Sequence, residues 1–237
     1  MPSHNPGDAR LVLLRHGQSV YNRDNRFTGW TDVDLSPQGM EEARAAGRML
    51  HRQGIVPDVC FASWLKRAVH TAQLALAEAQ SEHIDCRKSW ELNERHYGAW
   101  QGRDKDEVRR EVGEAAFAAV RRGYAARPPL LEPGDARDAA QEPRYRALSP
   151  WRPPLGESLA DTRQRVLHCY LHTVVPELAE GKTVLVSAHG NSLRALVMTL
   201  EGIAPEAVGT LEIPTGVPLL YTFDEGLNAR GKEVLGT

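Results

Sequence analysis

The sequence of 237 residues predicts an α/β fold, a three-layer sandwich in which helices cover both faces of a mostly parallel sheet. Two observations support this prediction. Three short apolar segments are each followed by a helical pattern. One of them, TVLVSA, is continuously apolar and rich in β-branched residues, as a strand covered on both faces should be. Strands that alternate with helices at this spacing are typical of a sheet packed between two helical layers.

The first strand, LVLL, leads to a helix whose start and end are both marked. Ser36 is a helix cap with Pro37 in the first turn, apolar residues recur at helical spacing, and Gly54 stops the pattern. The segments DVCFAS and TVLVSA are the next strands, and each again precedes a helix. The expected elements are strands at 11–14, 58–63 and 183–188 and helices at 37–53, 65–79 and 192–200.

A different kind of sequence lies between the second and third of these strand–helix units. Seven of the fifteen prolines fall between Pro128 and Pro154, in polar sequence with little apolar periodicity. Long irregular segments of this kind inside a compact domain are usually lids, binding loops or disordered. No internal repeat or linker divides the chain. We therefore expect one domain over 1–237, with an insertion at about 90–154 that forms part of the site.

Composition excludes several classes of function. A net charge of -2 without a charged tail argues against nucleic acid or a membrane surface as the main partner. No apolar run approaches the roughly 20 residues of a membrane helix, and residues 1–9 lack the pattern of a signal peptide. Cys60, Cys86 and Cys169 are odd in number and widely spaced, which favours reduced thiols in the cytoplasm over disulfides or zinc.

Two of the predicted strands end in the same way. The first runs into His16 and Gly17, and the third runs into His189 and Gly190. Ligands of open α/β sheets bind beyond the carboxyl ends of the strands. A single histidine there is more often a hydrogen-bonded structural residue. Two in the same setting, each followed by a glycine that lets the backbone approach a ligand, favour one shared site.

Cations near these positions indicate an anionic ligand. Arg15 precedes His16, Arg67 lies in the helix after the second strand, and Lys105, Arg121 and Arg122 fall in the insertion. The planar guanidinium binds phosphate or carboxylate in a bidentate manner. Each of these residues alone reads as a solvated surface charge. Their combination predicts a site for a phosphorylated compound.

The sequence lacks the usual phosphate-binding and metal-binding motifs. Residues 176–183 end like a P-loop but precede a strand, and neither a GxGxxG motif nor HExxH occurs, so we expect no metal. A neutral imidazole can attack phosphorus and pass the phosphoryl group onward. We expect His16 to do so, with Arg15, Arg67 and a protonated His189 around the phosphoryl oxygens.

Longer motifs carry a family resemblance over about residues 11–223. LVLLRHGQSVYNRDNRFTGWTDVDLSPQG, LKRAVHTA, LNERHYGAWQG, AHGNSLRALV and IPTGVPLLY resemble the cofactor-dependent phosphoglycerate mutases of the histidine phosphatase superfamily. RHG alone indicates only the superfamily, whereas FTGW, NERHYG and IPTGVP in this order are far more specific. The resemblance implies a phosphoglycerate mutase-like fold, interconversion of 2- and 3-phosphoglycerate in glycolysis and gluconeogenesis, and 2,3-bisphosphoglycerate as the phosphoryl donor.

The resemblance also implies roles for individual residues. His16 would be the phosphorylated nucleophile, with Arg15, Arg67 and His189 binding the transferred group. Glu94 would exchange protons with the substrate hydroxyl, which must lose its proton as it attacks phosphorus. The phosphoglycerate site would be lined by Ser19, Asn22, Thr28, Gly29, Arg95, His96, Tyr97, Lys105, Arg121, Arg122, Gly190 and Asn191.

Other readings stay open at this point. Gln18 and Tyr21 depart from the residues usual in the family, although neither change affects the expected chemistry. Little sequence follows Gly236, so we expect the insertion or another subunit to close the site, or closure to be incomplete. A histidine phosphatase, or a bisphosphoglycerate mutase/phosphatase, on the same fold is one alternative. A silent phospho-ligand binding module is another, disfavoured by the presence of His16, Glu94 and His189. A homodimer or higher homo-oligomer is left open.

Overall fold

A six-stranded mixed sheet forms the centre of the computed structural model, which describes residues 9–236. Residues 1–8, most of the stretch that lacks a signal-peptide pattern, and Thr237 lie outside the described residues. The strand order is β3-β2-β4-β1-β5-β6. The pairs β1/β4, β2/β4 and β2/β3 are parallel, whereas β5 runs antiparallel to β1 and β6. The strands are β1 (Arg10–Arg15), β2 (Val59–Ser63), β3 (Cys86–Ser89), β4 (Thr183–Ala188), β5 (Pro218–Phe223) and β6 (Ala229–Val234).

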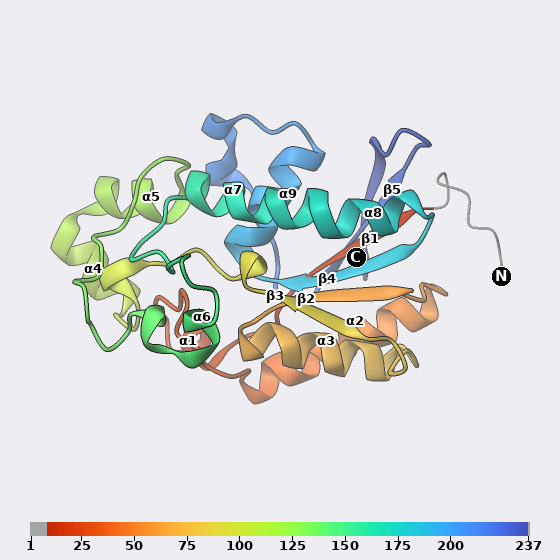
Figure 1. The fold of residues 1–237 in the computed structure, drawn as a ribbon, viewed down its shortest axis with the longest axis horizontal. Coiled ribbons are helices and arrows are strands. Elements are labelled where there is room, and N and C mark those ends of the chain that lie inside the picture. The colour runs from red at the N-terminus through yellow and green to blue at the C-terminus, as the bar shows by residue number, and fades with distance from the viewer. Residues whose placement is uncertain (1–8, 237) are drawn as a thin grey trace.

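Helices cover both faces of this sheet, so the predicted three-layer sandwich is confirmed (Figure 1). One face carries α2 (Pro37–Arg52) and α3 (Lys66–Glu78). The other carries α7 (Leu159–Cys169), a π-helical turn (Tyr170–Val174), α8 (Val175–Ala179) and α9 (Gly190–Leu200). Among the described residues, no helix is both long enough and apolar enough to cross a membrane.

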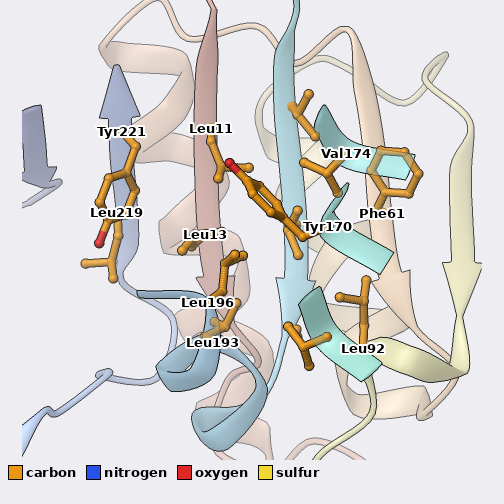
Figure 2. Packing of buried hydrophobic residues seen from close by; sticks show 14 of the residues in the cluster. Leu11, Leu13, Phe61, Leu92, Tyr170, Val174, Leu193, Leu196, Leu219 and Tyr221 are labelled. Carbon is orange, nitrogen blue, oxygen red and sulfur yellow. The ribbon is translucent and has the colours of Figure 1, made fainter. Parts of the chain in front are cut away.

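Alternation along β1 explains why this strand is apolar at every position. Leu11 and Leu13 pack toward α7–α9, where Figure 2 shows them on the same side of the sheet as Tyr170, Leu193 and Leu196. The intervening Val12 and Leu14 pack instead in the cluster formed with α2 and α3. Both faces of the strand are covered, which explains why its interior positions are all apolar.

The start of α2 follows the sequence signal closely. The Ser36 Oγ accepts a hydrogen bond from the Gly39 amide at 3.1 Å, and Pro37 occupies the first turn. The helix then packs on α3 so closely that a Cβ at Gly47 would lie 2.2 Å from the carbonyl oxygen of Ala75. Glycine is therefore required at this helix crossing.

The insertion gathers at one end of the sheet, beyond the carboxyl ends of the parallel strands (Figure 1). It contains α4 (Lys105–Val112), α5 (Glu114–Arg122) and α6 (Pro143–Arg146), and it lies beside the short α1 (Val20–Arg23). The proline-rich stretch is more ordered than its sequence indicates, because Tyr145 is buried and stacks on Trp30. The assignment of this segment as an insertion within a single domain stays a prediction.

Candidate active site

The site begins where β1 and β4 end. These strands are neighbours in parallel register, with Arg15 opposite Ala188, so the next residues, His16 and His189, emerge side by side. Their ring centroids lie 4.9 Å apart, and both side chains are almost completely buried. The sheet topology thus brings together the two histidines that the sequence places 173 positions apart.

Hydrogen bonds fix the protonation and orientation of His16. Its Nδ1 lies 2.7 Å from the Gly17 carbonyl oxygen, which can only accept, so Nδ1 carries the proton. Its Nε2 accepts from Nε of Arg67 at 3.3 Å. Burial, followed by the charges of Arg67 and Arg15, holds the pKa of His16 well below its usual range. The ring is therefore neutral, with the lone pair of a potential nucleophile on Nε2.

The glycine after His16 is required by close packing. A Cβ at Gly17 would lie 2.1 Å from the carbonyl oxygen of Gly39 in α2, and the Gly17 amide donates to Oγ1 of Thr71 in α3. The backbone after β1 is thereby held between α2 and α3. This packing explains why a bare backbone follows the histidine.

Two arginines surround His16 and remain cations. Arg67 is fully buried and donates to the carbonyl oxygens of Gly29 and Thr31 at 2.8 and 3.0 Å. Burial lowers its pKa to about 10, which leaves it charged at neutral pH. Arg15 donates from Nη1 to the Ile213 carbonyl, while its buried Nε has no partner. Part of the Arg15 fork is therefore free to donate to a ligand.

His189 is neutral as well, contrary to the expectation of a protonated ring. Burial, then Arg67 and His16, holds its pKa well below the usual range. Its Nε2 lies 2.6 Å from Oγ of Ser63 at the end of β2, and its buried Nδ1 has no partner. The protein's own groups therefore favour the neutral form, and only added negative charge nearby would favour protonation.

Glu94 is held by backbone donors. Its Oε1 accepts from the amides of Arg95 at 2.8 Å and Asn191 at 3.1 Å, and the side chain is 9% exposed. The second amide belongs to the first turn of α9, directly after His189. This contact joins the insertion to the end of β4 and leaves Oε2 to face the pocket or a substrate proton.

A pocket opens beside these groups and is lined by six cations. Burial, followed by Arg121 and Arg15, lowers the pKa of one of them, Lys105, to about 8. Such a concentration of positive charge suits a small polyanion. The lining residues are Arg15, Asn22, Arg26, Phe27, Thr28, Gly29, Glu94, Tyr97, Lys105, Arg121, Arg122, Gly190, Asn191, Arg194 and Glu212.

The residues predicted from the sequence fall into three groups. Arg15, Glu94 and all of the predicted binding residues except Ser19, Arg95 and His96 line the pocket. His16 and His189 at the strand ends and Arg67 in the first turn of α3 are buried and do not line it.

The three exceptions support the pocket from behind. Ser19 caps α1 and accepts from the Asn22 amide, and Arg95 donates to the Tyr97 hydroxyl at 2.7 Å. His96 packs against Trp30, and its Nδ1 accepts from the Gly98 amide. Burial lowers the pKa of His96 to about 4, as expected for a neutral ring inside the protein.

Four charged or polar residues of the site were not predicted. Arg194 lies four positions after Gly190 on α9, so helical spacing alone could have placed it on the same face, and it donates to Oδ1 of Asn191. Ser63 could have been noticed as the polar end of a buried strand. Arg26 and Glu212 carry no signal, because only the tertiary structure brings their loops to the pocket.

Comparisons with known proteins agree with this site. Residues 11–138 and 132–229 match the family model of the histidine phosphatase superfamily (branch 1). The chain is 50% identical over 220 residues to a 2,3-bisphosphoglycerate-dependent phosphoglycerate mutase from Thermobifida fusca, covering 93% of this chain and 89% of the relative. It is also 50% identical over 226 residues to the enzyme of the same name from Nitratidesulfovibrio vulgaris, covering 95% and 91%.

Solved structures show the same fold at lower sequence identity. A mycobacterial glucosyl-3-phosphoglycerate phosphatase superposes with a TM-score of 0.70 at 25% identity, over 95% of this chain and 97% of that one. Bacillus stearothermophilus YhfR superposes with a TM-score of 0.71 at 23% identity, over 93% and 94%. Together with the two histidines at neighbouring strand ends, these matches show that the chain belongs to the 2,3-bisphosphoglycerate-dependent phosphoglycerate mutase family of the histidine phosphatase superfamily.

Proposed function

We propose that this protein interconverts 2-phosphoglycerate and 3-phosphoglycerate through a phosphorylated His16. One observation carries the proposal: a buried, neutral histidine, whose unprotonated Nε2 accepts a hydrogen bond from Arg67, lies beside a pocket lined by six cations. The names of relatives that are 45–50% identical support the same reaction. These phosphoglycerates are the small-molecule partners of the chain.

The pocket fits 2,3-bisphosphoglycerate, which supplies the phosphoryl group that primes His16. The partnerless Nε of Arg15 and the cluster of lining cations match a compact ligand with several anionic groups. The remaining predicted residues are proposed to position the phosphoglycerate. They are Ser19, Asn22, Thr28, Gly29, Arg95, Tyr97, Lys105, Arg121, Arg122, Gly190 and Asn191, with His96 supporting them from the core behind the pocket.

His16 accepts the phosphoryl group on Nε2 while its Nδ1–H stays bonded to the Gly17 carbonyl. Arg67 and Arg15 balance the charge that spreads over the phosphoryl oxygens during transfer. The arriving negative charge raises the pKa of His189, which takes up a proton and donates a hydrogen bond to the transferred group. Ser63 holds the His189 ring in place through its Nε2.

Glu94 is the general acid–base group that exchanges a proton with the substrate hydroxyl. The hydroxyl that receives the phosphoryl group from His16 gives its proton to this carboxylate, and the reverse step returns it. Because the carboxylate is held by two backbone amides, it keeps its position while its protonation changes. Such positioned acid–base groups contribute about 10²- to 10⁴-fold to turnover.

A phosphatase activity on the same fold is the weaker reading. The relatives that are about half identical over most of the chain are named as mutases, whereas the solved phosphatase superposes at 25% identity. A cytoplasmic location and a homo-oligomeric assembly accompany the proposal, to be checked by cell fractionation and light scattering.

The deciding experiment supplies 3-phosphoglycerate with and without 2,3-bisphosphoglycerate and follows 2-phosphoglycerate and inorganic phosphate together. We expect 2-phosphoglycerate to form rapidly only when the bisphosphate primes the enzyme, with little phosphate released. Full activity without the bisphosphate but with an added divalent metal would reject the proposal. Release of phosphate as the main product would assign a phosphatase.

A further inference from the structure

Glu212 is an acidic residue in a pocket otherwise dominated by positive charge. Its Oε1 lies 2.5 Å from Nη1 of Arg122, the last residue of α5. Glu212 comes from the segment between α9 and β5, so the ion pair joins the insertion to the opposite wall of the pocket. The two side chains are 65% and 32% exposed, which places the pair at the pocket mouth.

Among the charged residues that line the pocket, Glu212 and Arg122 are the pair in which a carboxylate contacts a cation. Within residues 9–236, the other five lining cations form no ion pair with a carboxylate, so they are available to an anionic ligand. Glu94, the second acid in the lining, uses its Oε1 to accept backbone amides. Glu212 thus pairs with Arg122 and leaves the other five lining cations without an acidic partner in the described part of the chain.

The backbone on either side of Glu212 is held by the pocket itself. The Leu211 carbonyl accepts from Nε of Arg194 at 3.0 Å, and the Ile213 carbonyl accepts from Nη1 of Arg15 at 2.6 Å. Burial lowers the pKa of Arg15, and the charge of Glu212 acts in the opposite direction. The carboxylate is therefore presented at a fixed place, although its side chain is mostly in solvent.

We propose that Glu212 competes with the second anionic group of the ligand for Arg122. The inference rests on the proposed function: when the phosphoryl group of a phosphoglycerate meets His16, its carboxylate is left to face the cations of the mouth. A ligand with this second charge displaces Glu212, whereas a ligand with a phosphoryl group alone leaves the pair intact. Glu212 thereby weakens binding of the substrate and speeds its release.

The test compares Glu212→Gln with Glu206→Gln, an exposed residue of the preceding turn that carries the same charge change. Calorimetry would measure binding of 3-phosphoglycerate and of glycerol 3-phosphate, which lacks the carboxylate. We expect Glu212→Gln to tighten 3-phosphoglycerate binding by about two- to fivefold, the range of an exposed ion pair. Glycerol 3-phosphate binding, and both ligands in Glu206→Gln, should be unchanged.

A double-mutant cycle identifies the competing partner. The gain in affinity from Glu212→Gln should vanish when Arg122→Gln is already present, because Glu212 and the ligand then have no shared cation to compete for. Glu212→Ala should reproduce the gain of Glu212→Gln, and circular dichroism would verify that each variant is folded. Unchanged 3-phosphoglycerate binding, an equal gain for both ligands, or a gain that persists without Arg122 would each overturn the inference.

Binding is measured here without turnover, so the two proposals can fail separately. A carboxylate-dependent gain in a protein that shows no bisphosphate-primed mutase activity would keep the role of Glu212 and reject the mutase. An active mutase in which Glu212→Gln leaves binding unchanged would keep the function and reject the competition.

Discussion

The base and the mouth of the site are built in different ways. The base consists of His16, Arg67 and His189, which are at most 3% exposed and come from strand ends and a core helix. The mouth consists of Lys105, Arg121, Arg122 and Glu212, which come from the insertion and the segment before β5 and are partly or largely exposed. Under the proposed function, the chemistry falls to buried residues of the strand ends and a core helix, and ligand selection falls to the segments around them.

The sharpest test of this division is at the base. His16→Asn should leave a folded protein that takes up no acid-labile phosphate from labelled 2,3-bisphosphoglycerate, because the Nε2 of the neighbouring His189 is already hydrogen-bonded to Ser63. The His168→Asn variant, at an exposed ring that contacts Glu91 and does not line the pocket, should label normally. Labelling that survives in His16→Asn would show that another residue is the nucleophile and would contradict the division between the base and the mouth of the site.

Glu94 lies between the two regions and should affect turnover alone. Glu94→Gln keeps the acceptor for the Arg95 and Asn191 amides but cannot carry the substrate proton. We expect kcat to fall by about 10²- to 10⁴-fold with KM nearly unchanged. Steady-state kinetics in both directions would measure it, and near-normal turnover would remove Glu94 from the mechanism.

A substitution at the mouth should change KM and leave kcat nearly unchanged, the reverse of the effect expected for Glu94. Arg121→Gln removes a cation that faces the pocket without an acidic partner among the described residues. A charged hydrogen bond contributes about 1.5–3 kcal/mol, so KM for 3-phosphoglycerate should rise about 10- to 100-fold. The kcat should change far less. A loss confined to kcat would show that the mouth takes part in the chemistry.

The smallest effect on activity is expected at His96, which belongs to neither region. A buried histidine with a pKa of about 4 stays neutral in the folded protein, whereas the unfolded chain takes up a proton below about pH 6.5. Stability should therefore fall as the pH falls from about 6.5 toward 4, by about 2 kcal/mol at pH 5.

Urea unfolding at pH 7 and pH 5 measures this effect. His96→Asn should lose this part of the pH dependence while turnover stays close to the original, because Asn can still accept from the Gly98 amide. An identical pH dependence in both proteins would show that His96 is not held neutral, and a large loss of turnover would return it to the site.

The same division explains what the sequence could predict. Strand-end residues such as His16 and His189 were found because a buried strand and the following glycine mark them locally. The edge strands β3 and β6 were missed, because CRKS and ARGKEV face solvent and carry no apolar alternation. Lys105 and Arg121 were noticed as cations of the insertion, and the family resemblance then implied their place in the site. Glu212 was missed because its meeting with Arg122 depends on how two distant segments pack.

The position of β1 in the sheet has a consequence for synthesis of the chain. Within the described residues 9–236, residues 10–15 pair only with 183–188 and 218–222, which leave the ribosome far later. At about 5–20 residues per second, this apolar strand waits roughly ten seconds or longer for its neighbours. During that interval, its exposed apolar side chains and unpaired edges are prone to aggregation. A chain interrupted before β4 would also lack His189, so an incomplete translation product cannot assemble the buried part of the site.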